Sequence, residues 1–345
     1  MNARVVGLRA SLEEPLLVAA PANVRYLVGF SSSNAALLVE PERVRLFSDF
    51  RYAEAGRAVA DVEFVETKRD LFTDLADQLE GRIGFEGDAL TYTQYARLAA
   101  GGLELVPRHG LVEGLRVVKD DGELQAIRAA GAITSEALER FAGERFTGRT
   151  ERELAWVLDG LFHELGAEGP SFETIVAGGE NAARPHSRPT DRVLKPGETV
   201  VIDAAARLDG YCADCTRTFA TGALPERLQE AYEVCLAAQL AGLDAVRAGT
   251  GGIEADAAAR AVIEAAGFGE EFGHGLGHGL GIEVHEAPRL SRESHDTLAA
   301  GNVVTVEPGI YLQGLGGIRI EDLVVVRDGE PEILTTFRKE LVTVF

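Results

Sequence analysis

Cysteine is scarce in this chain of 345 residues, which contains only three. An odd and sparse set argues against a disulfide framework and is typical of a reducing compartment, so we expect a cytoplasmic protein. Cys212 and Cys215 form a CxxC, a spacing found in zinc and redox sites. The chain has no second CxxC, and in the strand-like segment that contains the pair, residues three apart face opposite ways. The pattern therefore favours two unconnected structural cysteines.

Long hydrophobic runs are absent as well, and basic residues are fewer than acidic ones. No apolar stretch approaches the roughly 20 residues that a membrane-spanning helix needs. The first residues show no apolar block before a small-residue cleavage site, so we expect no signal peptide. With 34 basic and 55 acidic residues the formal charge is −21, which disfavours binding to nucleic acid or to an anionic membrane. What remains is a globular chain, 46% hydrophobic and long enough for two domains.

The pattern of apolar residues changes near residue 116. Up to residue 115, short apolar runs alternate with helical stretches, which predicts a small α/β domain. From 116 to 345, grouped helices with long strands and hairpins predict an α+β domain. The expected strands are 35–39, 44–47, 62–65, 81–85, 174–177, 199–205, 211–220, 303–307 and 318–326. The expected helices are 50–59, 71–79, 120–141, 150–166, 225–246 and 254–265.

Capping signals mark where the long helices of the second domain begin. Asp120 with Glu123, and Thr150 with Glu153, have the spacing of a capping box, in which each side chain accepts a hydrogen bond from the backbone N–H of the other residue. Pro225 is favourable at a helix start because its missing N–H would have no partner there.

Glycine and histidine alternate in residues 272–286, which we call the glycine–histidine segment. Glycines occupy every second position from 273 to 281, and His274, His278 and His285 lie among and after them. Imidazoles ligate metals or move protons, and glycine lets the main chain approach another group closely. We therefore expect this segment at a metal site that admits a substrate, with the thin glycine backbone leaving room for it.

Two aspartates are expected to meet across a hairpin. Asp209-Gly210 is typical of a two-residue hairpin loop. With that loop, Asp203 opposes Thr216, and Asp214 lies diagonally across from Asp203 on the same face. Two carboxylates on an apolar surface repel each other, which favours a metal ion between them. A solvated sheet face explains the pair equally well.

Two glutamates lie in similarly apolar surroundings. Glu307 ends an apolar run before Pro308, which stops the strand. Glu321 alternates with apolar residues in 317–326, and strand parity places Arg319 on its face. An exposed edge or a simple pair with Arg319 is the alternative explanation for Glu321.

Four carboxylates with one histidine suit a pair of divalent ions. Mostly oxygen ligands favour Mn²⁺, with Co²⁺ or Zn²⁺ as alternatives. Two such ions, about 3.5–4 Å apart, bind a shared hydroxide and polarise a carbonyl. A zincin is disfavoured because the sequence after His285 lacks the second histidine of HExxH.

In order along the chain, these residues resemble the ligand motifs of the pita-bread metallopeptidases, the superfamily of methionine aminopeptidase and the Xaa-Pro peptidases. The matching motifs are the apolar strand before Asp203, Ala-Asp-Cys-Thr-Arg-Thr around Asp214, Gly-His-Gly around His278, Val-Glu-Pro-Gly around Glu307 and Ile-Arg-Ile-Glu-Asp around Glu321. Two departures are Ala205, where the family usually has glycine, and Cys215, where it has an aliphatic residue.

The first domain resembles the N-terminal domain of creatinase and the Xaa-Pro peptidases, which methionine aminopeptidases lack. The similarity lies in 23–30 and 48–52. The resemblance thus implies a pita-bread catalytic domain at 116–345, preceded by a smaller creatinase-like α/β domain at 1–115. Because relatives are usually dimers, it also implies a homodimer.

The resemblance implies hydrolysis of the peptide bond before proline, with two divalent ions. One ion would be held by Asp203, Asp214 and Glu321, and the other by Asp214, His278, Glu307 and Glu321. Glu307 is the expected general base. His285 and His186 would polarise the carbonyl, and Arg319 would orient an acidic ligand. For His186, which lies in a matching segment at 178–186, a loop histidine capping backbone carbonyls is the alternative.

The resemblance also implies a substrate pocket. The proline ring of a small peptide with proline in second position would lie against Phe172, His274, Ile282 and His285. Arg289 and Arg51 are candidates for binding a free carboxylate, although Arg51 could equally form an ion pair with Asp49 or Glu54. We expect an Xaa-Pro dipeptidase (prolidase), with an Xaa-Pro aminopeptidase (aminopeptidase P) as the alternative and a non-catalytic peptide-binding module as a remote one.

Overall fold

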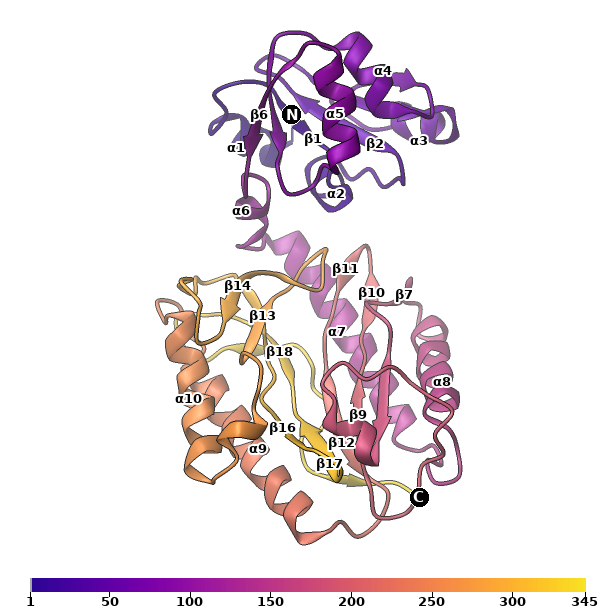
Figure 1. The fold of residues 1–345 in the computed structure, drawn as a ribbon, viewed down its shortest axis with the longest axis vertical. Helices are drawn as coiled ribbons and strands as arrows, with labels where there is room; N and C mark the ends of the chain where they lie inside the picture. Colours follow the sequence, from indigo (N-terminus) through magenta and orange to yellow (C-terminus); the bar gives the residue numbers. More distant parts are fainter. Residues whose placement is uncertain (1) are drawn as a thin grey trace. The chain divides into compact units, whose positions relative to one another are not determined.

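The computed structural model describes residues 2–345 and contains two compact units. The N-terminal unit ends at Arg116, and the C-terminal unit runs from Val117 to Phe345. Figure 1 shows a mixture of helices and sheets in each unit, which confirms the expected α/β and α+β classes. Among the described residues, no helix is long and apolar enough to cross a membrane.

The N-terminal unit is built on one six-stranded sheet with the order β4-β3-β2-β1-β5-β6. β1 pairs antiparallel with β2 and parallel with β5, so the sheet is mixed. Its core joins the sheet to helices α4 and α5, with Leu17, Phe47, Leu75 and Leu98 fully buried. The elements are α1 (Ala3–Arg9), β1 (Leu16–Val18), α2 (Pro21–Val28), β2 (Ala35–Val39), β3 (Val44–Asp49), η1 (Phe50–Tyr52), α3 (Ala53–Arg57), β4 (Glu63–Thr67), α4 (Leu71–Gln78), β5 (Arg82–Glu86), α5 (Tyr92–Ala100), β6 (Glu104–Arg108) and α6 (Glu113–Arg116).

The sequence predicted β2 to β5 and α4 but missed β1, β6, α1, α2 and α5. β1 has only three residues, which is too short for an alternation of apolar and polar residues to show. The single helix expected at 50–59 is wrong. It is a 3₁₀ turn, η1, followed by the short helix α3. The side chain of Asp49 accepts a hydrogen bond from the backbone N–H of Arg51 and caps that turn.

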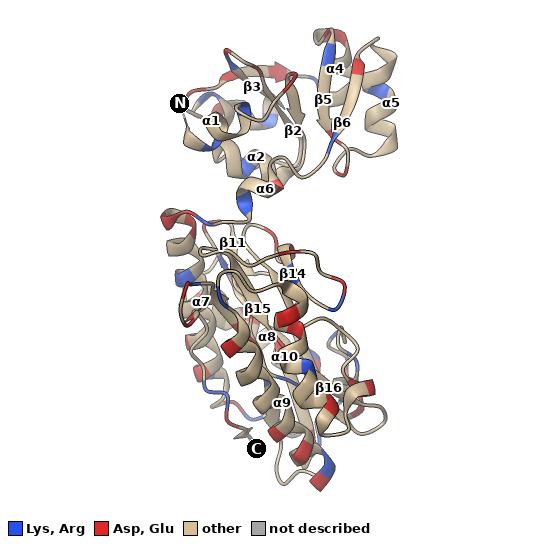
Figure 2. Ribbon diagram, turned by 90° about the vertical axis from the view of Figure 1, so that its left-hand side faces the viewer, with Lys and Arg blue, Asp and Glu red and all other residues tan. Residues whose placement is uncertain are grey.

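Four long helices of the C-terminal unit flank its strands in two pairs, α7 with α8 and α9 with α10 (Figure 1). Asp120 and Thr150 cap α7 and α8 in the expected capping boxes. One core packs α7 and α8 against β8, β9 and β12, and a second packs α9 and α10 against β15 to β18. Figure 2 shows acidic residues along the outer faces of α9 and α10. The helical elements are α7 (Asp121–Phe141), α8 (Glu151–Glu164), η2 (Gly179–Ala183), α9 (Glu226–Ala245), α10 (Gly252–Ala265) and η3 (Gly269–Glu271).

The hairpin that carries the two aspartates has the predicted register. Asp203 pairs with Thr216, and Leu208 pairs with Tyr211 across the loop. Asp209 and Gly210 both have positive φ, 48° and 71°, as a type I′ turn requires. The ladder is interrupted on both strands, which leaves β9 (Thr199–Asp203), β10 (Ala206–Leu208), β11 (Tyr211–Cys212) and β12 (Thr216–Ala220). These pair further with β7 (Gly169–Pro170), β8 (Ile175–Gly178) and β20 (Val342–Thr343).

The single strand expected at 318–326 is divided in the structure, so that prediction is wrong. β17 (Gly316–Arg319) pairs with β16 (Gly309–Leu312), whereas β18 (Asp322–Val325) pairs with β15 (Val303–Val306). At the break, the backbone N–H of Glu321 donates to the carbonyl of Thr216 in β12 at 3.0 Å. The break therefore brings Glu321 to the aspartate hairpin. β15 and β18 share their sheet with β13 (Gly277–Gly279), β14 (Glu286–Leu290) and β19 (Glu332–Ile333).

Two of the alternating glycines are required for strand packing, a reason that the sequence did not suggest. A Cβ on Gly277 would lie 2.1 Å from the carbonyl oxygen of Thr305, and one on Gly279 would lie 2.1 Å from that of Ala287. Glycine is needed because the neighbouring backbones of β15 and β14 fill this space. At these two positions the thin backbone makes room for the protein's own main chain.

The CxxC cysteines lie apart in the core, as the sequence favoured. Cys212 and Cys215 are both buried and free, and they belong to different core clusters. The thiol of Cys212 faces the carbonyl of Ile282, and that of Cys215 faces the carbonyl of Glu321. Burial raises the pKa of the Cys215 thiol to about 12, so it stays protonated at neutral pH. Neither thiol has the character of a nucleophile or a metal ligand.

Candidate metal centre

Three carboxylates converge where the aspartate hairpin meets the β17–β18 break. Asp203 ends β9, Asp214 lies between β11 and β12, and Glu321 lies between β17 and β18. One carboxylate oxygen from each lies within 4.8 Å of the others. Asp214 and Glu321 are only 4% and 2% exposed. The hairpin register and the break in the second strand together produce this cluster.

His278 and Glu307 complete the cluster from the other side. Nε2 of His278, in β13, lies 3.2 Å from Oε1 of Glu307 and 3.8 Å from Oδ2 of Asp214. Nδ1 of His278 lies 3.0 Å from the carbonyl oxygen of Gly279, which can only accept a hydrogen bond. Nδ1 therefore carries a proton and Nε2 faces the acids, where it donates to Glu307 while the ring is protonated, a bond that, against the opposing effect of burial, raises the pKa of His278. Once that second proton leaves, Nε2 can ligate a metal. The Thr305 hydroxyl donates to Oε1 of Glu307 at 3.0 Å and fixes that carboxylate.

The acids strongly perturb one another's ionisation. Burial, then the neighbouring Glu321 and Asp203, raise the pKa of Asp214 well above its ordinary value. Burial, then Glu307 and Asp203, do the same to the pKa of Glu321. Burial also acts to raise the pKa of Glu307, but the hydrogen bond and charge of His278 outweigh it and lower this pKa to about 2. Without a cation, keeping all of these buried carboxylates ionised is unfavourable in free energy.

The residues present fit divalent metal ions. Oδ1 of Asp203 is buried and has no hydrogen-bond partner among the described residues, and such an orphaned oxygen is costly unless a cation binds it. Four carboxylates with one imidazole form a mainly oxygen donor set, which suits Mn²⁺ and similar ions. This orphaned acceptor is the structural observation that makes the cluster a candidate metal site.

Arg319 supports the cluster from behind. Its Nη2 donates to Oδ2 of Asp203 at 2.6 Å, and its Nε donates to the hydroxyl of Thr216 at 2.9 Å. The Thr216 hydroxyl in turn donates to Oε2 of Glu321 at 2.7 Å. Arg319 thus contacts Asp203 directly and Glu321 through Thr216. The simple Arg319–Glu321 pair that the sequence left open is not what forms.

Tyr311, in β16, belongs to the same network and was missed by the sequence analysis. Its hydroxyl accepts from Nη1 of Arg319 at 2.9 Å and lies 2.9 Å from Nε2 of His274. Nδ1 of His274 lies 2.8 Å from the carbonyl oxygen of Gly275, so Nδ1 is the protonated nitrogen and Nε2 accepts from the tyrosine. Tyr311 is 6% exposed. A lone buried tyrosine carries no sequence signal that distinguishes it from a core residue.

The other expected site residues have varied surroundings. The ring of His285 lies 4.4 Å from that of His278, and His285 is exposed to solvent. His186 lies on an exposed turn. Its neighbour Pro185 accepts from Arg319 through its carbonyl at 3.1 Å. Phe172 is half-buried against a core cluster, and Ile282 is half-buried beside the Cys212 thiol.

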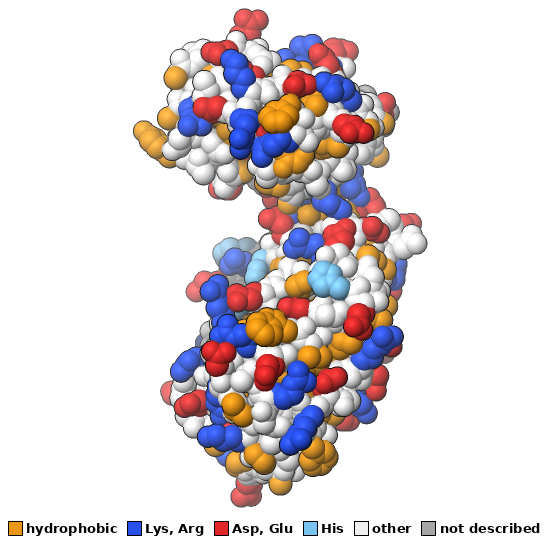
Figure 3. Space-filling model, turned by 90° about the vertical axis from the view of Figure 1, so that its right-hand side faces the viewer, with side chains coloured by type: hydrophobic (Ala, Val, Ile, Leu, Met, Phe, Trp, Pro, Cys, Tyr) orange, Lys and Arg blue, Asp and Glu red, His pale blue; other side chains and the backbone are white. Residues whose placement is uncertain are grey.

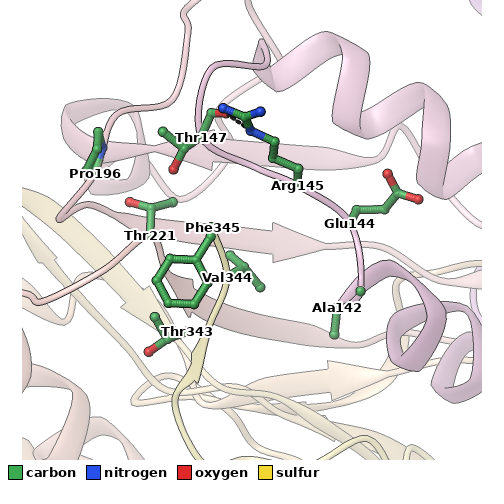
Figure 4. Close-up of a pocket in the computed structure, with 10 residues that line it drawn as sticks. Ala142, Glu144, Arg145, Thr147, Pro196, Thr221, Thr343, Val344 and Phe345 are labelled. Atoms are coloured by element: carbon green, nitrogen blue, oxygen red, sulfur yellow. Dashed lines mark hydrogen bonds between the residues drawn. The ribbon is translucent and has the colours of Figure 1, made fainter.

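Arg289, in β14, is exposed and lines the same hollow as His274, which has a volume of about 1170 Å³. Figure 3 shows basic and acidic side chains interspersed over one face of the C-terminal unit. A different cavity, of about 570 Å³, lies near the C-terminal Phe345 and contains none of the expected site residues (Figure 4).

Arg51, in the N-terminal unit, forms the ion pair that the sequence left open. Nε and Nη2 of Arg51 donate to the two carboxylate oxygens of Asp49 at 2.8 and 2.7 Å. Asp49 is fully buried, and Asn34 also donates to it. The hydrogen bond from Arg51, against the opposing effect of burial, holds the pKa of Asp49 well below its usual range. This pairing fixes the guanidinium within its own unit.

A buried cluster of acids with one histidine, fixed by an arginine, defines a metal-dependent hydrolase centre. The chain belongs to metallopeptidase family M24, whose model matches residues 125–328, and the creatinase/prolidase N-terminal domain matches residues 11–118. These matches confirm the family resemblance seen in the sequence.

Individual relatives cover nearly the whole chain. The chain is similar to the uncharacterized peptidase YqhT of Bacillus subtilis, with 38% identity over 95% of each chain. It is 33% identical to the Xaa-Pro dipeptidase of Pyrococcus furiosus over 94% of each chain. Among solved structures, the Xaa-Pro dipeptidase from Bacillus anthracis has a TM-score of 0.95 at 36% identity and 99% coverage of both chains. The X-Pro aminopeptidase from Thermotoga maritima has a TM-score of 0.87 at 34% identity, covering 96% of this chain and 97% of its own.

Proposed function

We propose that this protein is an Xaa-Pro dipeptidase that hydrolyses the peptide bond before proline in a metal-dependent reaction. The observation that carries the proposal is the cluster of Asp203, Asp214 and Glu321, in which one buried oxygen of Asp203 has no hydrogen-bond partner among the described residues. Relatives with about one-third identity along the whole chain are named Xaa-Pro dipeptidase, which supports this substrate class.

Two divalent ions, Mn²⁺ above all and Co²⁺ or Zn²⁺ as alternatives, fit the cluster. Asp203, Asp214 and Glu321 would hold one ion, and Asp214, His278, Glu307 and Glu321 the other. When bound, such ions polarise a carbonyl and supply a hydroxide at neutral pH. Asp214 and Glu321 would contribute to both ions, whose charge would offset the cost of keeping these buried carboxylates ionised.

The chain's own residues then manage protons and orientation. Glu307 is proposed as the general base, because its carboxylate is ionised and held by Thr305 and His278. His285, whose ring is tilted against that of His278, and His186 would donate to the substrate carbonyl as negative charge develops on it. Arg319 would keep Asp203 in its ligating orientation.

Substrate length depends on what lies beyond the proline ring. His274 and Arg289 line one hollow, so a ring against His274 would place its free carboxylate on the side of the exposed guanidinium. Phe172, Ile282 and His285 would form the rest of the ring pocket. This favours a dipeptide with proline in second position. Arg51 is a second candidate for the carboxylate, and its bidentate pair with Asp49 makes it the weaker one.

An Xaa-Pro aminopeptidase acting on longer peptides is the alternative, since relatives and neighbours with that name also match. A non-catalytic peptide-binding module is disfavoured because the acidic cluster and His278 are all present. A cytoplasmic homodimer that binds neither nucleic acid nor membrane is part of the same proposal.

Parallel assays of Ala-Pro and Ala-Pro-Ala with Mn²⁺ test the function. We expect hydrolysis of the dipeptide that is abolished by chelation and restored by Mn²⁺. Preference for the tripeptide would establish the aminopeptidase alternative. Metal-loaded protein that cleaves neither peptide would refute the proposal.

A further inference from the structure

Helix α10 contains a buried ion pair that none of the roles above uses. Asp256 and Arg260 are 1% and 7% exposed. Nε of Arg260 donates to Oδ2 of Asp256 at 2.7 Å, and Nη2 donates to Oδ1 at 2.9 Å. Such a two-pronged pair has strict geometry. Two buried charges are costly unless their remaining hydrogen-bonding groups are also used.

The pair's further hydrogen bonds go to the main chain of the glycine–histidine segment. Nη1 of Arg260 donates to the carbonyl of Phe272 at 3.0 Å, and Nη2 donates to that of His274 at 2.7 Å. Oδ1 of Asp256 accepts from the backbone N–H of Leu276 at 2.9 Å. Every second residue from 272 to 276 is therefore tied to α10. The guanidinium also lies 4.1 Å from the centre of the Phe272 ring, a cation–π distance.

Between the buried side chains of Phe272 and Leu276, this part of the segment depends on hydrogen bonds. Residues 272–276 precede β13 and lie outside any strand or helix. Gly273 and Gly275 have no side chains to pack, and glycine leaves the backbone with the greatest conformational freedom. A Cβ at Gly273 would meet no atom within 4 Å. Hydrogen bonds from α10 therefore add to the core packing of Phe272 and Leu276 in holding this main chain.

The clamped main chain carries the His274 ring. That ring packs edge-on against Phe272, with centroids 5.1 Å apart, and Nε2 meets the Tyr311 hydroxyl at 2.9 Å. The carbonyl of Leu276 accepts from the backbone N–H of Glu307 at 2.8 Å. Arg260, Phe272 and His274 all line the hollow that also contains Arg289.

We propose that Asp256 and Arg260 are positioning residues that set the main chain at 272–276 and thereby hold His274 as a wall of the substrate pocket. The inference rests on the proposed Xaa-Pro activity in one respect, which is that the group bound against His274 is a proline ring. His278 is held separately, because its backbone N–H donates to the Thr305 hydroxyl oxygen at 3.1 Å and it lies in β13 between two strands. Arg260 bonds to Phe272 and His274, whereas Glu307 is reached only through Asp256 and Leu276. Loss of Arg260 should therefore affect substrate binding more than metal binding.

Arg260→Lys tests the proposal in the full-length protein. Lysine keeps a positive charge beside Asp256, but one ammonium cannot serve a carboxylate and two carbonyls in the guanidinium's fixed geometry. Arg128→Lys is the matched control, since Arg128 makes the same two-pronged pair with Glu332 of β19. Three measurements are compared: hydrogen–deuterium exchange of peptides within 268–280, KM and kcat for Ala-Pro, and the Kd for Mn²⁺ by calorimetry.

For Arg260→Lys we expect faster exchange in 272–276 and a KM raised by about tenfold, with kcat and the Mn²⁺ Kd changed by less than about threefold. The Arg128→Lys control should show neither change. Asp256→Asn keeps the shape and an acceptor for Leu276, so it should fold and raise KM by a smaller factor. It serves as the deciding variant if Arg260→Lys does not fold.

Unchanged exchange in 272–276 would overturn the proposal, as would an unchanged KM or a loss of Mn²⁺ affinity as large as the KM effect. If the unmodified protein fails to cleave Ala-Pro, the proposed dipeptidase function is refuted, but the positioning role of the pair is not. The exchange and Mn²⁺ measurements then decide the role of the pair without any substrate.

Discussion

Arg217 donates a hydrogen bond to the main-chain carbonyl of Glu321, next to the ion pair that its Nη2 forms with Oδ1 of Asp322 at 2.8 Å. The guanidinium is 2% exposed and also donates to the carbonyl of Phe337. It therefore joins β12 both to the backbone of a proposed metal ligand and to the C-terminal segment.

Replacing Arg217 by methionine should destabilise the protein strongly. The change leaves the buried carboxylate of Asp322 without its arginine partner. Removing one partner of a buried ion pair costs about 3–5 kcal/mol. Urea unfolding followed by circular dichroism measures the loss. Arg140→Met, in an exposed pair with Glu136 whose side chains are 49% and 52% exposed, is the control and should cost less than about 1 kcal/mol. Similar losses in both variants would contradict the importance of the buried pair.

Chelation should lower the stability of the protein, and Mn²⁺ should restore it. In the metal-free protein, burial and the neighbouring carboxylates raise the pKa of both Asp214 and Glu321. A ligand that binds only the folded state at 100 times its Kd adds about 2.7 kcal/mol. Melting curves with EDTA and with increasing Mn²⁺ measure the shift, with Mg²⁺ as a weaker-binding control. Identical melting temperatures with EDTA and with Mn²⁺ would argue against a structural metal site.

Asp203→Ala should keep the fold but lose metal and hydrolysis together. Asp203 ends its strand and contributes the buried oxygen without a partner. Its removal also breaks the pair with Arg319, but that guanidinium keeps its hydrogen bonds to Thr216, Tyr311 and the carbonyl of Pro185, so the protein should be less stable and still folded. Metal content by mass spectrometry, circular dichroism and Ala-Pro cleavage are measured on one sample. Asp209→Asn, in the loop of the same hairpin, should keep all three, because asparagine also adopts the positive φ found there. Full activity in Asp203→Ala would refute the proposed ligand set.

Glu332 should make stability depend on acid pH. Hydrogen bonds from Arg128, against the opposing effect of burial, and then from Arg327, lower the pKa of Glu332 from 4.5 to about 2. Because the folded-state pKa is the lower one, this contribution is present above pH 4.5 and is lost as pH falls toward 2. The side chain is 35% exposed, so solvent screening reduces the contribution to about 1 kcal/mol. Glu332→Gln should be less stable than the unmodified protein at pH 7, and the difference should disappear near pH 2; an equal difference at both values would exclude this linkage.

Local chemistry made the aspartate hairpin predictable. A two-residue Asp-Gly loop permits one strand register, and that register determines which residues face each other. Asp203 and Asp214 could therefore be brought together from the sequence. The capping boxes at Asp120 and Thr150 located two long helices for the same reason, since both partners lie within one turn.

Features that depend on partners far along the chain could not be predicted in this way. Alternation of apolar residues continues through Ile320 and Glu321, so the break between β17 and β18 leaves no local mark. It arises because the backbone of Glu321 pairs with Thr216. The Asp256–Arg260 pair has an ordinary helical spacing, and only the fold shows that it binds the glycine–histidine segment.

The position of Glu321 has a consequence for how the C-terminal unit holds together. Asp203 and Asp214 come from the hairpin packed on α7 and α8, whereas His278 and Glu307 come from the strands packed on α9 and α10. Glu321 lies at the seam between these halves, with its backbone bonded to β12 and its chain continuing into β18. Bound metal would therefore act as a removable cross-link between two halves of one polypeptide. Even if the chain were cut between β12 and α9, neither fragment would carry the full ligand set, and metal binding would report their reassembly.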